Sequence, residues 1–280
     1  MKVFVLNLEY EHYRRQFITQ QLEKLGLDYE IQNCVIGKNL TQEELEQEVH
    51  MGYMAKSPNW FTPGAIGATI TVKRLYHKIL EMGLPYALIM EDDLVLSKNL
   101  PKLLNDIEKT IVDGEIIFLY HSTTHSSKNA ALFSNVEKQK INVDFDLYYP
   151  IDELQISMGS GFIITPKAMR GILKANTPIV VIGDSWDYYY RQGGVMQYRA
   201  IWPHALKPAD FKSTIEYTSL IFKKHPFIPK ILKFINDYRI FPIYHYLRYK
   251  RKSERIKREK LLLLTPHQNS QKKNNKSTYR

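Results

Sequence analysis

Apolar and polar positions along the chain alternate between the periods of strands and of helices. Five stretches have the apolar runs or the two-residue alternation of strands: residues 2–8, 29–36, 87–90, 115–120 and 159–165. Helical spacing and capping residues predict helices at residues 11–25, 41–49, 63–82 and 100–112 and from Pro166. This alternation is typical of an α/β protein with a mostly parallel sheet and helices on both faces. Residues 121–155 are polar, and we expect them to be irregular.

The pattern changes in the last quarter of the chain. Residues 217–249 are rich in aromatic residues, prolines and cations, and residues 250–264 combine Arg and Lys with four leucines. The last 16 residues are polar and basic, a composition typical of disorder. We therefore expect an α/β domain at 1–217, a basic amphipathic extension at 218–264 and a disordered tail at 265–280.

The positive charge of the chain is concentrated at its C-terminal end. The formal net charge is +10, yet residues 221–280 hold 17 Lys and Arg against 3 Asp and Glu, while the other 220 residues hold 22 against 26. Such asymmetry indicates an anionic partner for this end. Aromatic residues interleaved with the cations favour an anionic lipid surface. Nucleic acid binding and an ordinary solvated charged end are the alternatives.

The sequence carries no sign of export. The segment Met1–Leu8 is too short and turns polar too abruptly for a signal peptide. No apolar run approaches the roughly 18 residues that a membrane-spanning helix needs. A single cysteine, Cys34, excludes an internal disulfide and fits a reducing compartment. We therefore expect a cytoplasmic protein.

Three acidic residues follow directly on an apolar strand. The run Ala87–Met90 has the length of a strand that is buried on both faces. Directly after it come Glu91, Asp92 and Asp93. Open α/β sheets bind ligands at the carboxyl ends of their strands, and clustered carboxylates repel one another unless a cation neutralises them. The motif predicts a divalent metal and diphosphate site, with Asp93 on the metal and Glu91 toward a ribose or a sugar. The alternative is a helix N-cap at Asp93 or Ser97.

A second acidic motif lies at residues 182–190. Asp184 and Asp187 are three residues apart and would share one face of a helix. Either is a candidate general base that deprotonates an acceptor hydroxyl. Trp186 and the neighbouring tyrosines offer apolar faces on which a sugar ring can stack. The alternative is a helix N-cap at Asp184 with these aromatic rings packed in the core.

Two shorter motifs supply further candidates. Gly64 and Gly67, at the start of the long helix, would let backbone approach a phosphate or a ribose. A Pro/Gly helix entry is the alternative. His204 is a candidate late metal ligand, or else a surface or packing histidine.

The order of these motifs resembles that of glycosyltransferase family 25, the lipooligosaccharide galactosyltransferases. The resemblance covers about residues 1–210, and the matching segments are Val3–Leu8, Arg14–Arg15, Thr62–Gly67, Leu88–Val95, Gly159–Ala168 and Gly183–Asp187. It implies a GT-A-like fold, a UDP-sugar donor that is usually UDP-galactose, inversion at the anomeric carbon, and a divalent cofactor, manganese or magnesium. It also implies a lipid-linked oligosaccharide acceptor at the cytoplasmic face of the inner membrane of a Gram-negative bacterium. A peripheral enzyme held there by its basic end agrees with the charge pattern.

The resemblance also bears on individual residues. It places Asn7 and Leu8 at the strand end that faces the nucleotide, and Asp93 as the metal-binding acid. With the motifs above, the expected donor-binding residues are Asn7, Leu8, Gly64, Gly67, Glu91 and Asp92. Along the long helix the family usually has Glu, Cys and a Ser–His pair, where this chain has Ala65, Ala68, Thr71 and Val72.

The leading interpretation is a metal-dependent, inverting hexosyltransferase that extends a lipooligosaccharide or lipopolysaccharide core. UDP-glucose or a UDP-N-acetylhexosamine as donor, with another glycan as acceptor, is an alternative. A phosphotransferase or phosphohydrolase would use the same carboxylates, but the chain has no P-loop signature and no nucleophile motif. A non-catalytic protein that binds glycans or nucleic acid through its basic end is the third alternative. Under the leading interpretation we expect no nucleic acid partner.

Overall fold

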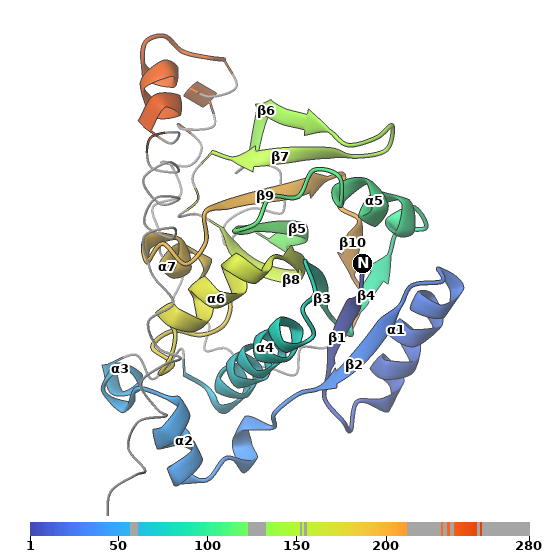
Figure 1. Cartoon of the computed structure of the whole chain (residues 1–280), viewed down its shortest axis with the longest axis vertical. Helices are drawn as coiled ribbons and strands as arrows, with labels where there is room; N and C mark the ends of the chain where they lie inside the picture. The colour runs from blue at the N-terminus through green and yellow to red at the C-terminus, as the bar shows by residue number, and fades with distance from the viewer. Residues whose placement is uncertain are drawn as a thin grey trace, which may run out of the picture.

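The computed structural model contains an eight-stranded sheet with helices on both faces (Figure 1). It describes residues 1–56, 61–122, 133–151, 153, 156–211, 231, 234–235, 238–250 and 253. In spatial order the strands are β2 (Tyr29–Asn33), β1 (Val3–Asn7), β3 (Ala87–Glu91), β8 (Ser157–Ile164), β5 (Glu115–Ser122), β9 (Gln197–Trp202), β7 (Asp146–Pro150) and β6 (Phe133–Lys140). A second sheet pairs β4 (Leu94–Leu96) with β10 (Leu206–Pro208). The helices are α1 (His12–Lys24), η1 (Gly37–Asn39), α2 (Gln42–Glu48), α3 (Met51–Lys56), α4 (Pro63–Glu81), α5 (Leu100–Ile107), α6 (Pro166–Ala175) and α7 (Trp186–Arg191).

The direction of β8 makes the sheet mixed rather than mostly parallel. β1 pairs in parallel with β2 and β3, and β5 pairs in parallel with β9. In contrast, β8 runs antiparallel between β3 and β5, and β7 runs antiparallel to β9 and β6. A parallel return requires a crossover, usually a helix, and the described residues between β5 and β8 contain no α-helix. The prediction of a mostly parallel sheet was therefore wrong, and the stretch predicted to be irregular contains β6 and β7.

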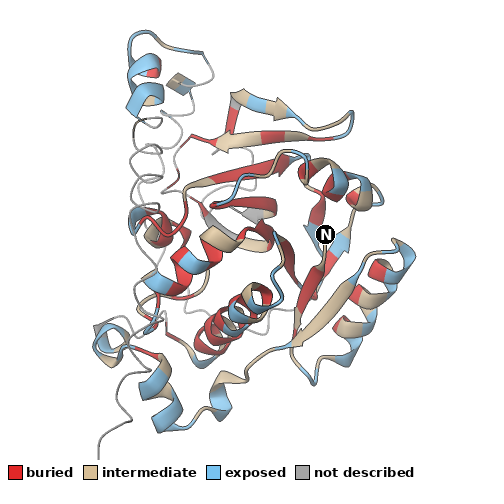
Figure 2. Cartoon of the chain, viewed as in Figure 1, coloured by how far each residue is buried: buried red, intermediate tan, exposed pale blue. Residues whose placement is uncertain are grey.

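Two apolar layers cover the sheet, one on each face. Ala87 and Ile89 of β3 pack in one layer with residues of α4, α6 and α7. Leu88 and Met90 pack in the other layer with residues of α1 and α5. All four side chains are buried, whereas Glu91 at the end of the strand is exposed. Buried residues follow the central strands and the inward sides of the helices (Figure 2). The predicted strand buried on both faces is confirmed, and its last residue, Glu91, places a carboxylate at the edge of the sheet.

Helix α4 lies against the loop after β2 because two glycines allow a close approach. The helix begins after the N-cap Thr62, whose Oγ1 accepts a backbone hydrogen bond of 3.3 Å. A Cβ atom on Gly67 would lie 2.3 Å from the carbonyl oxygen of Val35. A Cβ atom on Gly37 would lie 1.7 Å from the carbonyl oxygen of Pro63. Both positions therefore require glycine, and the first turn of α4 meets the segment that follows β2.

The C-terminal extension is described only in part. Residues 243–250 are helical, and the buried Tyr244 donates a 3.5 Å hydrogen bond to Oε1 of Glu137 in β6. Nε of Arg248 lies 3.4 Å from the same oxygen. The expected boundary at 217, most of the extension and the tail at 265–280 lie outside the described residues.

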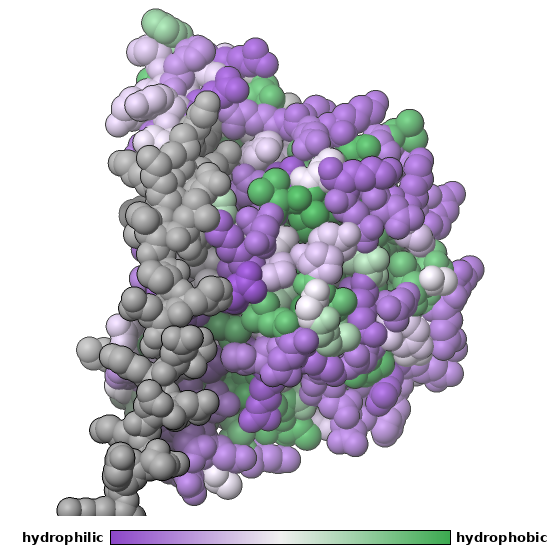
Figure 3. Space-filling view, in the orientation of Figure 1, coloured by the Kyte–Doolittle hydropathy of each residue, from purple (hydrophilic) through white to green (hydrophobic). Residues whose placement is uncertain are grey.

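Most of the surface seen in Figure 3 is hydrophilic, and hydrophobic side chains gather there in separate patches. In the part of the chain that the structure describes, no helix is both long and apolar enough to cross a membrane.

Candidate active site

A pocket of about 380 Å³ lies where β1 and β3 end. Because these strands are parallel, their carboxyl ends share one edge of the sheet, as in other ligand-binding α/β sheets. Leu6 and Leu8 come from the end of β1, and Val35 and Ile36 follow β2. Ala68 of α4 completes this apolar part of the lining. The pocket therefore offers a largely apolar wall beside the two strand ends.

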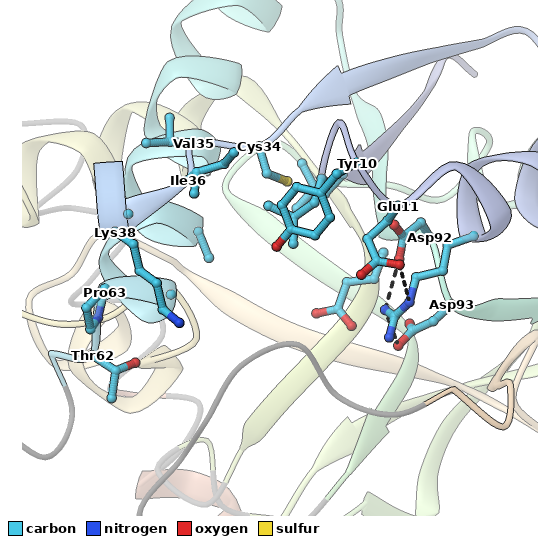
Figure 4. A pocket seen from close by; sticks show the side chains of 17 residues that line it. Tyr10, Glu11, Cys34, Val35, Ile36, Lys38, Thr62, Pro63, Asp92 and Asp93 are labelled. Carbon is cyan, nitrogen blue, oxygen red and sulfur yellow. Dashed lines mark hydrogen bonds and ion pairs between the residues drawn. The ribbon is translucent and has the colours of Figure 1, made fainter. Parts of the chain in front are cut away.

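The polar groups of the pocket lie at two separate ends. Glu11, Asp92 and Asp93 lie together at one end (Figure 4). Lys38 and Thr62 lie at the other, where α4 begins (Figure 4). The first turn of a long helix carries unpaired backbone N–H groups and a partial positive charge. One end thus favours a cation and the other an anion.

Asp92 is held in place by two neighbours. It is only 6% exposed, its Oδ2 accepts a 2.7 Å hydrogen bond from Nδ2 of Asn7, and its Oδ1 accepts one of 3.3 Å from Nη1 of Arg14. Asn7 is itself buried and does not line the pocket. The structure therefore places Asp92 as a supported carboxylate, with Asn7 as its support.

Arg14 is a site residue whose role the sequence motifs did not reveal. Its Nη1 lies 3.4 Å from Oδ2 of Asp93, and its Nε lies 3.7 Å from Oε2 of Glu11. The guanidinium lies 5.2 Å from the ring centroid of Phe211. A signal was present in α1, because Arg14 falls four residues before the buried Ile18 on the inward face of the helix. An arginine on an apolar face, in a chain with clustered acids, indicates a buried ion pair.

Glu91 projects into the pocket and has a perturbed acidity. Solvent reaches its side chain through the open pocket, but protein surrounds it at longer range. Desolvation and the nearby charge of Asp93 raise the pKa of Glu91 to about 7, against the effect of a hydrogen bond with Ser160. Desolvation also raises the pKa of Asp93, while Arg14 lowers it. A cation bound near these two carboxylates would lower the pKa of both.

The donor set of the pocket suits a divalent cation that arrives with phosphate. The described residues contain no group of three or more His, Cys, Asp or Glu side chains arranged to hold a metal. Asp92 is engaged by Asn7 and Arg14. Glu11, Glu91 and Asp93 also line the pocket, and Asp93 and Glu11 lie 3.4 and 3.7 Å from Arg14. Magnesium-like cations are commonly held by one or two carboxylates, with substrate phosphates and water as the other ligands. The residues fit that arrangement rather than a cage built by protein alone.

His204 lies apart from the acidic cluster. Its ring packs between those of Tyr120 and Trp202, with centroids 5.0 and 4.9 Å away. Leu206 pairs with Leu96 at one end of the β4–β10 ladder, and the backbone of Ala209 bonds to Asp93 beyond the other end. His204 and Asp93 thus lie at opposite ends of β10, and the structure does not bring them together. Burial, helped by the charge of Lys207, lowers the pKa of His204 to about 4.

The second acidic motif contributes one carboxylate near the pocket. Asp184 is close enough to Glu91 to contribute to its raised pKa. Burial raises the pKa of Asp184 itself, and the charge of Asp187 adds to this. Asp187 pairs instead with Arg191 on α7, at 3.2 Å. The N-cap of α7 is Ser185, so Asp184 does not cap the helix.

The aromatic residues of this motif belong to the core. Trp186 is 2% exposed, and its ring meets those of Phe118 and Phe162 at 5.3 and 5.1 Å. Its carbonyl oxygen accepts a 2.8 Å hydrogen bond from the hydroxyl of Tyr198. Tyr189 and the adjacent Tyr190 are also buried. The predicted sugar-stacking role of Trp186 was therefore wrong, and the core-packing alternative is confirmed.

The sequence model described as "Glycosyltransferase family 25 (LPS biosynthesis protein)" matches residues 1–186. The chain belongs to glycosyltransferase family 25. The matched stretch contains every pocket residue and Asp184.

Two curated relatives match a shorter part of the chain. Procollagen galactosyltransferases 1-A and 1-B of Xenopus laevis are each 29% identical to this family 25 chain over 126 residues. The match covers 42% of this chain and 21% of either relative, so it spans about a fifth of their length. Among solved structures, mannose-1-phosphate geranyltransferase from Thermus thermophilus aligns with a TM-score of 0.34 and 9% identity, over 71% of this chain and 72% of that one. At that score the likeness carries no information on function.

Two of the four positions at which this family 25 chain departs from the expected pattern contact the pocket or the loop after β2. Ala68 lines the pocket, and Oγ1 of Thr71 accepts a 2.8 Å hydrogen bond from the backbone N of Val35. Among the expected donor-binding glycines, Gly64 lines the pocket, whereas Gly67 serves the packing of α4 against the loop. Of the other two positions that depart from the pattern, Ala65 is buried and Val72 packs against the core.

Proposed function

We propose that this chain is a UDP-sugar-dependent hexosyltransferase with a GT-A-like fold that acts by inversion. The observation that carries the proposal is the pocket with two polar ends, in which strand-end carboxylates lie opposite a helix N-terminus and Lys38. The apolar wall of Leu6, Leu8 and Val35 suits a nucleobase. Glu91 and Asp93 would hold manganese or magnesium, and such a cation stabilises the charge of a departing diphosphate.

Asp184 is the proposed general base. It lies near Glu91, whereas Asp187 is paired with Arg191. In an inverting transfer the base takes the proton of the acceptor hydroxyl while that oxygen attacks the anomeric carbon. The bond from the sugar to UDP breaks, and its electron pair leaves with the phosphate. Burial raises the pKa of Asp184 from its ordinary value, which favours proton uptake.

Galactose is the proposed sugar, and a lipid-linked lipopolysaccharide or lipooligosaccharide core the proposed acceptor. The family description supports the acceptor class, and the names of the curated relatives support galactose. UDP-glucose and UDP-N-acetylhexosamines are the competing donors.

The basic extension is proposed to hold the enzyme on the cytoplasmic face of an anionic inner membrane. In its described part, Tyr238, Phe241 and Tyr249 are 70%, 79% and 73% exposed. Arg248 and Lys250 are exposed on the same short helix. Exposed aromatic rings beside cations are typical of segments that lie on anionic lipid.

Release of UDP from a panel of UDP-sugars, with manganese and a soluble core oligosaccharide, tests the proposal. We expect turnover with UDP-galactose, a loss of turnover in Asp93→Asn, and a fall in kcat of roughly 100-fold or more in Asp184→Asn. Asp144→Asn, at an exposed turn between β6 and β7, is the matched control and should keep full activity. If only a UDP-sugar other than UDP-galactose supported transfer, the proposed donor would be wrong. If none of the UDP-sugars supported transfer, the proposed function would be refuted.

A further inference from the structure

The acidic end of the pocket contains its own counter-ion. Arg14 contacts three carboxylates, at 3.3 Å from Asp92, 3.4 Å from Asp93 and 3.7 Å from Glu11. Its side chain is only 9% exposed, so solvent screens these charges weakly. In the described structure the repulsion among the acids is therefore relieved by an arginine.

This arrangement works against a divalent cation that binds alone. Asp93, which is proposed to hold the cation together with Glu91, lines the pocket, and one of its oxygens already pairs with Arg14. A guanidinium a few ångströms away also repels a second positive charge. No three-residue metal cluster exists among the described residues to compensate.

We propose that Arg14 couples the binding of the divalent cation to the binding of the donor diphosphate. The inference rests on the function proposed above. A diphosphate offers the planar guanidinium a bidentate partner and draws Arg14 away from Asp93. Asp93 is then available to the cation, and the phosphate oxygens supply the remaining ligands. Arg14 acts through Asp93 and is a positioning residue rather than a catalytic one.

Calorimetric titration of the full chain tests this coupling. Three affinities are measured: Mn²⁺ alone, UDP alone in the presence of EDTA, and Mn²⁺ with saturating UDP after subtraction of the Mn²⁺–UDP blank. In the wild type, we expect UDP to tighten Mn²⁺ binding by about tenfold or more. In Arg14→Gln, Mn²⁺ alone should bind about tenfold tighter than in the wild type, while UDP alone binds more weakly. A purely structural role would weaken both.

Two further variants separate charge from folding. Arg14→Lys keeps the charge and should keep Mn²⁺ binding weak in the absence of UDP. Arg15→Gln removes one charge from the next position of the same helix, which contacts none of these acids in the described structure, and should change neither affinity. If Arg14→Gln does not fold, the wild-type comparison can still overturn the coupling, because equal Mn²⁺ affinity with and without UDP would contradict it.

The outcomes distinguish the inference from the function beneath it. Equal Mn²⁺ affinity with and without UDP in the wild type overturns the coupling, as does an Arg14→Gln variant that binds Mn²⁺ alone no more tightly. Neither result affects the glycosyltransferase proposal. A wild-type chain that binds no UDP under any condition overturns both.

Discussion

Asn7, at the end of β1, donates a 2.7 Å hydrogen bond to Oδ2 of Asp92, the residue that follows β3. Asn7 and Asp92 are 1% and 6% exposed. The bond joins two neighbouring parallel strands at the edge of the pocket and occupies one oxygen of the middle carboxylate. Asn7 therefore acts on the site through Asp92.

Removal of this bond should cost stability. Asn7→Ala leaves a buried carboxylate with one partner fewer, and we expect the free energy of unfolding to fall by about 1–3 kcal/mol. Urea denaturation measures the change. Asn33→Ala, at the exposed end of the adjacent β2, is the matched control and should change stability by less than about 0.5 kcal/mol. Equal losses in the two variants would show that the bond contributes nothing.

The raised pKa of Glu91 should appear in the pH dependence of stability without metal. Because its pKa rises from 4.5 to about 7 in the folded chain, the folded state binds more protons between these values than the unfolded state does. Stability from this group is therefore present at low pH and is lost as pH rises through about 7. In EDTA, we expect the difference in melting temperature, wild type minus Glu91→Gln, to decrease as the pH is raised from 5 to 8. A constant difference would contradict the raised pKa.

Trp186 should behave as a core residue and not as a sugar platform. Its ring is packed among Phe118, Phe162 and Tyr198, so Trp186→Ala should lower the free energy of unfolding by about 3–5 kcal/mol. Trp202→Ala is the control, because Trp202 is 41% exposed, and its loss should be much smaller. Urea titrations of both variants check the contrast. A stable Trp186→Ala with a selective defect in acceptor binding would reverse our interpretation.

Cys34 should resist alkylation although it lines the pocket. Desolvation, with added effects from the charges of Asp92 and Glu91, raises the pKa of its thiol to about 12. Only the thiolate reacts, so modification by iodoacetamide at pH 8 should be far slower than that of the same chain in urea. Mass spectrometry of timed samples follows the reaction. Equal rates in the folded and unfolded chain would refute the raised pKa.

The exposed rings of the C-terminal extension should contribute to lipid binding. Phe241→Ser and Tyr249→Ser should each reduce co-sedimentation with vesicles that contain phosphatidylglycerol. Lys250→Glu should also weaken the binding, because loss of the lysine charge alone lowers the binding free energy by about 1 kcal/mol. Val143→Ser is the control, because Val143 is equally exposed, at 81%, on the turn between β6 and β7. If all of these variants bound the vesicles as well as the wild type does, the proposed membrane role of the extension would be wrong.

Predictions from sequence were accurate where the signal was local. The helix expected at residues 41–49 is present as α2, and a capping box of Thr41 and Glu44 begins it. Pro63 opens a helix that ends before Gly83, whose φ is +67°. The apolar run Ala87–Met90 is a buried strand. Each depends mainly on a few adjacent residues, so the signal is contained in the local sequence.

The errors arose where a feature depends on distant segments. The reversed direction of β8 follows from its place between β3 and β5, which no local pattern encodes. The role of Trp186 likewise depends on distant segments, because an aromatic residue beside an acid is equally typical of a binding face and of a core position. The depth of packing, set by Phe118 and Phe162 from other strands, decides between them.

Local sequence is enough to predict that a buried strand leads directly into Glu91, Asp92 and Asp93, because apolar runs and adjacent charges are properties of neighbouring residues. The tertiary structure alone decided how these carboxylates are used. Asn7 and Arg14 reach Asp92 across 85 and 78 residues of chain, and the packing of α1 and β1 on β3 brings them there. The charge balance of the pocket, in which Arg14 pairs with Asp92 and Asp93, is therefore a product of long-range packing.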